Sequence, residues 1–267
     1  MPFTGSALSN KAMNALRPLW YDILLVWTFF TRIPAPHFIT HRFLADALWA
    51  LPLVCLLIAT VQFWGFVLIT FITGGSGVAL LWLVIAPIIV TGALHWDGLA
   101  DLADGLGVGP DRRTEVMRDS AVGAFAVLTL IAVFLMQLGL FADLRASQAS
   151  IGFLSIGFLP RLFVALLSRQ FMALLWAKLP AADALSQANR LGTPDRWLHG
   201  GLFAGFVLVA WALGLINFWS VLALIGFAFA WGAALWHWLS GINGDGLGAT
   251  QVITETFILI LMVASHI

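Results

Sequence analysis

Acidic side chains crowd one short part of this sequence, residues 95–105, which read HWDGLADLADG. Asp97, Asp101 and Asp104 follow the spacing i, i+4, i+7, so on an α-helix they lie within about 60° of arc on one face. Ionised carboxylates so close together repel unless some are protonated or cations lie between them. Oxygen ligands without a cysteine or three-histidine pattern suit Mg²⁺ or Mn²⁺. The spacing therefore predicts a divalent-cation site on a helix.

A second acidic segment follows directly. Glycines and a proline within residues 105–110 are expected to break the first helix, and a second helix is expected to begin near Asp111. On this second helix Glu115 and Asp119 are spaced i, i+4 and would share a face. Two helices joined by such a turn would face each other, so we expect four or five carboxylates to meet in one site.

Arginines accompany the acids. Arg112, Arg113 and Arg118 lie in the second segment and could bind phosphate oxygens. A divalent-cation site beside phosphate-binding arginines is typical of metal-assisted phosphoryl transfer. Two other interpretations stay open: a solvated acidic loop without chemistry, and an ion or proton pathway of a transporter. The acids cluster at one surface and several arginines lie beside them. Both features favour phosphoryl transfer over an ion or proton pathway.

The whole chain is too apolar for a soluble domain. Of its 267 residues 61% are hydrophobic and 10% are charged, whereas soluble domains carry about 25% charged residues. The formal net charge is zero, which gives no attraction for nucleic acid as a partner. The single cysteine, Cys55, excludes an intramolecular disulfide and a cysteine-based zinc site. We predict an all-α polytopic integral membrane protein, one domain over residues 1–267, with the lipid bilayer as its surroundings.

About seven transmembrane helices are expected, because apolar runs of spanning length recur along the chain. The stretch 19–31 is too short to span comfortably and contains Asp22, and Pro34 and Pro36 follow it. A short re-entrant or interfacial helix is therefore expected there. The expected spans are 44–71, 78–96, 121–141, 151–177, 200–216, 218–238 and 251–267.

Basic residues divide unevenly between the two sides that these spans define. Ten lysines and arginines fall on one side and only Arg145 on the other. Because short cytoplasmic loops are rich in lysine and arginine, the first side is predicted to be cytoplasmic. All the polar motif loops fall on this side, namely residues 31–43, 97–120, 178–199 and 239–250.

Residues 95–105 resemble the H-x-D-G-L-A-D-x-x-D-G signature of the adenosylcobinamide-GDP ribazoletransferases, the cobalamin (5′-phosphate) synthase family. The resemblance covers nearly the full length in the right order. It continues with TRIPAP at 31–36, EVMRDSAVGA at 115–124, Arg161, and NGDGLGA at 243–249.

The resemblance implies a reaction in which adenosylcobinamide-GDP and α-ribazole, or α-ribazole 5′-phosphate, give adenosylcobalamin or its 5′-phosphate and GMP. It implies Mg²⁺ as the cofactor, with Mn²⁺ as an alternative. It also implies a location in the bacterial inner membrane with the active site facing the cytoplasm. A homo-oligomer, or a complex with other enzymes of the cobalamin pathway, is compatible with it.

The resemblance also suggests roles for single residues. Asp97, Asp101 and Asp119 are expected to bind the metal, with Asp104 and Glu115 as further ligands. Either Asp119 or Asp104 would accept the proton of the ribazole hydroxyl, and the sequence does not choose between them. Arg118 is the expected catalytic arginine at the pyrophosphate. The other expected substrate-binding residues are Arg32, Arg112, Arg113, Asn243 and Asp245.

The CDP-alcohol phosphotransferases form the alternative enzyme class, with the motif D-x-x-D-G-x-x-A-R and the same type of chemistry. Asp97 and Gly98 match its D-G pair. However, Leu94 stands where its first aspartate is expected, and Asp101 stands where its alanine is expected. An ion-coupled transporter with an acidic site is the alternative outside the enzymes.

Overall fold

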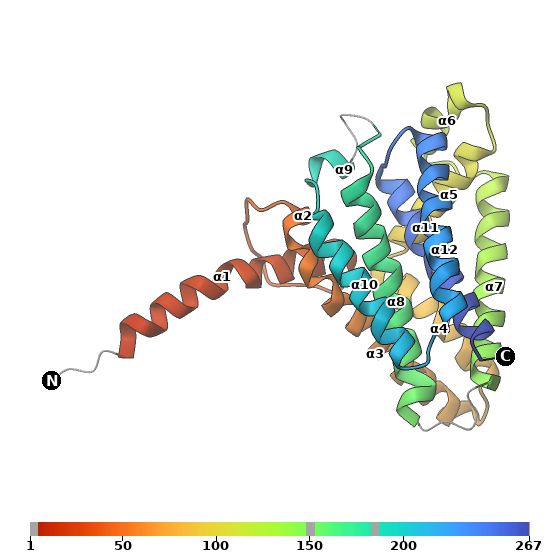
Figure 1. Ribbon diagram of the computed structural model, residues 1–267, viewed down its shortest axis with the longest axis horizontal. Coiled ribbons are helices and arrows are strands. Elements are labelled where there is room, and N and C mark those ends of the chain that lie inside the picture. The colour runs from red at the N-terminus through yellow and green to blue at the C-terminus, as the bar shows by residue number, and fades with distance from the viewer. Residues whose placement is uncertain (1–4, 148–152, 183–186, 267) are drawn as a thin grey trace.

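The computed structural model describes residues 5–147, 153–182 and 187–266. These parts of the chain are helical and contain no β-strand (Figure 1). Parts of two expected segments, the start of 151–177 and the middle of 178–199, lie outside the described residues. The helices are α1 (Gly5–Phe30), α2 (Leu44–Ala47), the short 3₁₀ helix η1 (Leu48–Ala50), α3 (Leu51–Thr73), α4 (Gly77–Thr91), α5 (Leu94–Leu106), α6 (Pro110–Met117), α7 (Ala124–Ser147), α8 (Phe153–Lys178), α9 (Gln187–Arg190), α10 (Arg196–Ala212), α11 (Phe218–Leu239) and α12 (Gly244–Ala264).

The protein is an all-α, multi-pass membrane protein, as its composition predicts. Within the described residues five helices are long and apolar enough to cross a membrane, and a sixth span results if the bent pair α4 and α5 counts as one. The expected count of seven is therefore not confirmed. The five spans are Leu44–Thr73, Ala124–Ala146, Gly157–Lys178, Phe218–Leu239 and Gly244–Ala264.

The expected span 78–96 is wrong as one straight helix. It ends at Thr91, and α5 leaves at an angle of 94° to α4. Gly92 and Ala93 both adopt the left-handed backbone conformation, each with a φ of 63°, and these two residues interrupt the helix and turn the chain. The acidic segment therefore lies on a helix of its own, whose direction is independent of the preceding span.

The expected span 200–216 also begins earlier. The helix α10 runs from Arg196 to Ala212 and has 17 residues. Asp195 caps it, because its carboxylate accepts hydrogen bonds from the backbone N–H groups of Leu198 and Trp197. These bonds hold the pKa of the Asp195 carboxyl below its usual value.

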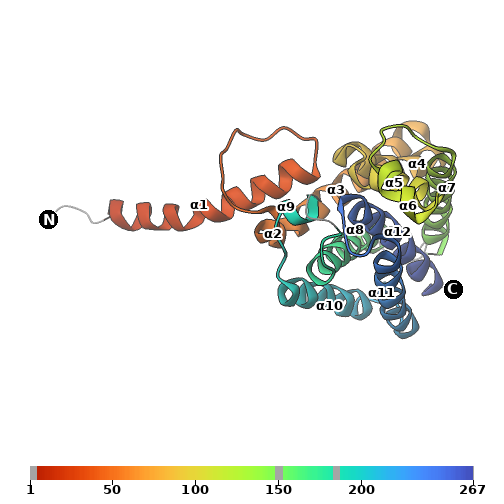
Figure 2. The ribbon, with the colours of Figure 1, turned by 90° about the horizontal axis from the view of Figure 1, so that it is seen from above.

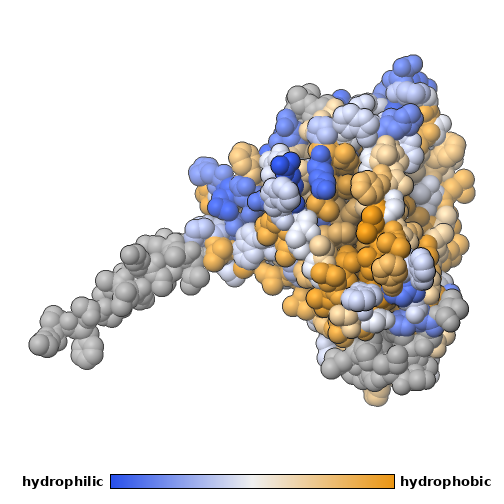
Figure 3. Space-filling model, viewed as in Figure 1, coloured by the Kyte–Doolittle hydropathy of each residue, from blue (hydrophilic) through white to orange (hydrophobic). Residues whose placement is uncertain are grey.

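The helix α12 lies at the centre of the bundle and packs against α5, α8 and α7 (Figures 1 and 2). Most of its side chains are buried, including polar ones such as Thr250 and Gln251. The outer helices α3, α7 and α11 expose many apolar side chains, which is the surface a lipid bilayer requires. The flank of the molecule is mostly hydrophobic, and hydrophilic residues gather near the end where α6 lies (Figure 3).

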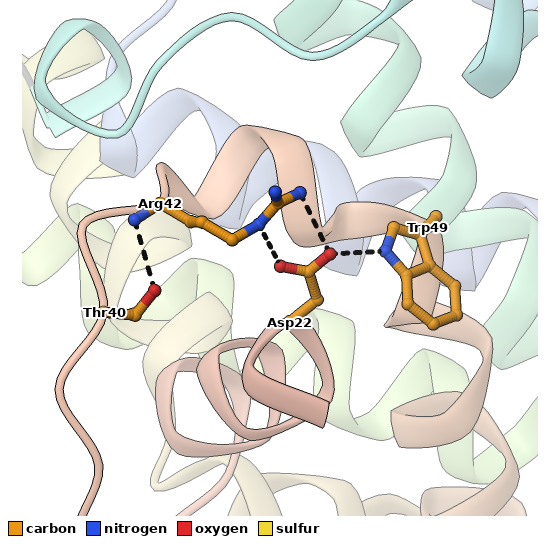
Figure 4. Close-up of polar contacts among 4 residues, drawn as sticks. All are labelled: Asp22, Thr40, Arg42 and Trp49. Atoms are coloured by element: carbon orange, nitrogen blue, oxygen red, sulfur yellow. Dashed lines mark hydrogen bonds and ion pairs between the residues drawn. The ribbon is translucent and has the colours of Figure 1, made fainter. Parts of the chain in front are cut away.

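The N-terminal helix α1 projects from the bundle (Figure 2). Its apolar part, Pro18–Phe30, is too short to span, as predicted. Asp22 within it is buried, and its carboxylate forms an ion pair with Arg42 and accepts a hydrogen bond of 2.9 Å from the Trp49 indole (Figure 4). The buried carboxylate thus fastens α1 to the loop 31–43 and to η1.

Candidate active site

The 95–105 and 243–249 motifs meet where α5 crosses the beginning of α12. A Cβ added at Gly98 would lie 2.8 Å from the carbonyl oxygen of Asp245, and one added at Gly248 would lie 3.0 Å from that of His95. The two backbones therefore touch, and only glycine allows this approach. As a result the 243–249 motif lies directly against the 95–105 motif.

This contact brings four carboxylates close enough for their charges to interact. We name these four residues the acidic cluster: Asp97, Asp101, Asp104 and Asp245. Asp101 is half-buried and is repelled by Asp245, Asp97 and Asp104, and Asp97 repels Asp245 in turn. Like charges at this density favour a bound cation or partial protonation. The sequence predicted the first three members and assigned Asp245 to the substrate instead.

The acidic cluster fits a divalent cation in its chemistry, since all its donors are oxygens and they repel one another. Among the described residues, no three histidine, cysteine or acidic side chains already lie close enough to hold one ion. A closed cage is not required, however. Mg²⁺ commonly binds one or two carboxylates and keeps its other positions for water and substrate phosphate.

Asp104 has a second role in the structure. Its carboxylate accepts hydrogen bonds from the backbone N–H groups of Gly123, at 2.6 Å, and Ala126, at 2.8 Å. These groups belong to the N-terminus of α7, where the helix dipole favours a negative charge. Asp104 therefore fixes the end of α5 to the start of α7, and a ligand role for its remaining lone pairs stays a prediction.

Glu115 and Asp119 do not share a helical face as expected. The helix α6 ends at Met117, so Asp119 lies in the irregular segment that follows. Its carboxylate accepts a hydrogen bond from the Ala121 backbone N–H at 3.1 Å. Glu115 is exposed and lies 3.8 Å from the Arg112 guanidinium. Neither acid is among the charges that act on Asp101.

The arginines divide into different roles. Arg113, predicted to bind substrate, donates to the backbone carbonyls of Gly105, at 3.2 Å, and Trp238, at 2.7 Å. It therefore joins the ends of α5 and α11. Arg112 is exposed beside Glu115.

Arg32 lies at the bend that leads into the acidic helix. Its side chain covers Gly92, where an added Cβ would lie 2.3 Å from its Nε. Its backbone N–H donates to the Val90 carbonyl at 2.8 Å. The loop 31–43 is thereby held against the start of α5.

Arg118 lines a pocket of about 220 Å³ together with Asn243 and Asp245. The pocket lies between α6, the end of α11 and the start of α12. Asn243 caps α12, because its side-chain oxygen accepts a 2.8 Å hydrogen bond from the Gly246 N–H. An arginine that faces a helix N-terminus is a suitable place for an anionic group.

Backbone hydrogen bonds join described parts of three of the four motif segments. Residues 178–182 pair with the loop 239–250 through hydrogen bonds between Ala182 and Ile242 at 2.9 Å and between Ile242 and Pro180 at 2.8 Å. At the border of the loop 31–43, Ala45 donates to the Leu191 carbonyl at 3.0 Å. Described residues of the segments 97–120, 178–199 and 239–250 therefore line the pocket, and the border of the loop 31–43 lies beside the 178–199 segment.

A buried arginine inside the bundle, Arg169, was missed from the sequence. Arg169 is only 1% exposed, and its Nε and one terminal nitrogen have no hydrogen-bond partner. His95 is buried beside it and stacks on Phe30, with ring centroids 5.9 Å apart. The triplet Ser-Arg-Gln at 168–170, inside an otherwise apolar run, is the signal that could have revealed this residue.

Fold and site together define a multi-pass membrane enzyme with one acidic site at one end of its helical bundle. Comparison with known families agrees. Residues 22–263 match the sequence model of the cobalamin-5-phosphate synthase family, and the chain belongs to this family.

The relatives carry consistent names. The chain is 34% identical over 259 residues to the adenosylcobinamide-GDP ribazoletransferase of Sinorhizobium medicae. The aligned residues cover 92% of this chain and 97% of the relative. The enzyme of the same name from Rhizobium meliloti is 34% identical over 264 residues, again with 92% and 97% covered. That of Ralstonia pickettii is 31% identical over 257 residues, with 92% and 96% covered. No solved structure matches the chain significantly. The protein is thus a transferase of cobalamin synthesis, and the resemblance inferred from the motifs is confirmed.

Proposed function

We propose that this protein joins α-ribazole, or α-ribazole 5′-phosphate, to adenosylcobinamide-GDP and releases GMP. In this reaction the ribazole hydroxyl attacks the phosphorus next to cobinamide, and the bond from that phosphorus to the GMP oxygen breaks. The proposal rests on the names of the relatives. The observation that carries it is the contact of the 95–105 and 243–249 motifs beside a pocket lined by Arg118.

The negative charge of the substrate diphosphate has to be neutralised, and this protein has two means of doing so. Arg118 and the N-terminus of α12 would hold phosphate oxygens in the pocket. Mg²⁺, with Mn²⁺ as an alternative, would neutralise the leaving phosphate when bound by the carboxylates. We propose Asp97 and Asp101 as its main ligands, with Asp245 added to the set because it lies beside them. Asp104 and Glu115 remain proposed further ligands. Asp119, expected as a main ligand, joins them because it is not among the charges that act on Asp101.

A carboxylate would accept the proton of the attacking hydroxyl. Asp104 and Asp119 are the candidates, and they differ in their hydrogen bonds. Asp104 is fixed by two backbone donors on α7. Asp119 is exposed, with one of its oxygens bonded to the Ala121 N–H. We therefore propose Asp119 as the base, because its second oxygen can approach a substrate hydroxyl.

The location completes the proposal. The ends of the helices that carry the four motif loops would face the cytoplasm of a bacterial inner membrane, since the lysine and arginine residues gather there. A homo-oligomer or a complex with other enzymes of the pathway is compatible with this arrangement.

The test is an assay of the purified protein in lipid nanodiscs. Adenosylcobinamide-GDP, α-ribazole 5′-phosphate and Mg²⁺ are supplied, and GMP release is followed. We expect GMP in step with corrinoid product, GMP release slowed by about 10²-fold or more in Asp101→Asn, and full release from Asp143→Asn, an exposed acid near the other end of α7. A folded protein that releases no GMP would refute the proposal, and ion flux in sealed vesicles would then favour the transporter.

A further inference from the structure

A second pocket with charged side chains lies at the other end of the bundle, away from the acidic cluster. It has a volume of about 150 Å³ and lies between α3, the end of α7 and the start of α8. In Figure 1 these segments occupy the end opposite α6. Its walls include Phe63, Phe66 and Phe141, and its charged lining consists of Arg145 and Arg161.

Both arginines lie against the same aromatic ring. The guanidinium carbon of Arg145 is 5.1 Å from the centroid of the Phe66 ring, and that of Arg161 is 5.2 Å from it. The ring attracts each cation, but the two cations repel each other. Phe66 therefore holds two like charges at one pocket.

Few interactions offset the cost of burying the Arg161 guanidinium. It is 8% exposed, one terminal nitrogen donates to the Gly157 carbonyl, and its Nε has no hydrogen-bond partner. Within the described part of the chain, neither Arg145 nor Arg161 forms an ion pair with a carboxylate. The intervening residues 148–152 read QASIG and contain no acid. A buried guanidinium without a counter-charge is costly, so this pocket favours an anion.

The surroundings of the pocket indicate which anion it takes. Trp64 and Leu68, on the same part of α3, are 59% and 57% exposed and face the lipid in a membrane. A free inorganic ion would gain nothing from the aromatic walls, whereas a phospholipid can place its phosphate on the arginines and its glycerol and acyl carbons against the rings. We propose that this pocket binds the phosphate group of an anionic phospholipid.

The proposal is independent of the transferase reaction, because the pocket and the acidic cluster lie at opposite ends of the helices. The test uses the full-length protein, stripped of lipid in a neutral detergent, with thermal unfolding as the readout. Phosphatidylglycerol, phosphatidylcholine and inorganic phosphate are titrated separately. A ligand that binds the folded protein raises its unfolding midpoint.

We expect phosphatidylglycerol to raise the midpoint more than phosphatidylcholine does. Arg145→Gln should remove about half or more of that difference, since one of the two phosphate-binding forks is gone. Arg145 is exposed, so this variant keeps the fold. Arg190→Gln removes an exposed arginine at the other end of the bundle and should keep the full response.

Native mass spectrometry gives the second measurement. The wild-type protein should retain phosphatidylglycerol at collision energies that strip it from Arg145→Gln. Equal responses to the two lipids, or an unchanged response in Arg145→Gln, would overturn the proposal. An equal rise with inorganic phosphate would overturn it too, because the pocket would then be a site for a free anion.

Discussion

The contact between α5 and α12 predicts a large effect of a single methyl group. In Gly98→Ala the new Cβ would lie 2.8, 3.0 and 3.2 Å from the carbonyl oxygen, Cα and carbonyl carbon of Asp245. All three atoms belong to the backbone, so no side-chain rotation relieves the contact. The two helices must separate by about 0.6 Å to restore an ordinary contact distance of 3.4 Å.

The magnitude follows from this displacement. Overpacking of this kind costs about 1–3 kcal/mol, and alanine in a helix returns about 0.5–1 kcal/mol of it. The variant should therefore lose about 0–2.5 kcal/mol of stability, with a central value of about 1 kcal/mol. Because a misplacement of about 1 Å can lower a rate about 10²-fold, we expect GMP release to fall at least about tenfold as Asp245 moves away from Asp97 and Asp101.

The matched control is Gly139→Ala, in the interior of α7, where an added Cβ meets nothing within 4 Å. It should keep full activity and gain slightly in stability. Thermal unfolding and GMP release are measured on both variants in the same nanodiscs. If Gly98→Ala behaves like Gly139→Ala in both measurements, the close crossing of the two helices does not position the site.

Other substitutions test the remaining parts of the site. Asp97→Asn and Asp101→Asn should each lower the rate of GMP release by about 10²-fold or more, while the unfolding midpoint stays equal or rises because repulsion is relieved. Chelation by EDTA should abolish GMP release and added Mg²⁺ should restore it, and full turnover in EDTA would remove the metal from the proposal. Arg118→Lys should lower kcat/KM for adenosylcobinamide-GDP about tenfold, or about 1.4 kcal/mol, with little change in the KM for ribazole phosphate. Arg113→Gln should instead lower the unfolding midpoint, because two backbone carbonyls lose their donor, and a purely catalytic loss at unchanged stability would contradict this role.

Local sequence signals were sufficient for several elements. The three aspartates do lie on one helix, and that helix ends at Leu106 before a new one begins at Pro110, as the glycines and the proline predicted. The apolar run near 218–238 likewise forms α11. The positions and ends of these helices depend on residues that are close in sequence, so composition and spacing are enough to predict them.

The failures have two physical causes. The break in the second expected span lies at Gly92 and Ala93, which are both left-handed. Glycine commonly ends a helix in this way, but alanine rarely adopts this conformation, so the residue type of Ala93 does not mark the second half of the turn. The partnership of Asp245 with Asp97 depends on a contact between residues far apart in the chain, made by glycines on both helices. Neither periodicity nor spacing contains that information.

The way in which α5 is held explains how carboxylates that repel one another can stay close together. The helix α5 is fixed at three places: Gly98 against the backbone of α12, Asp104 on the N-terminus of α7, and Gly105 through Arg113 to Trp238. Because the helix is held in place, a movement of its backbone cannot separate the carboxylates. Their repulsion is relieved only by proton uptake or by a cation, and a cation brought in with a diphosphate substrate would bind where the frame already holds its ligands.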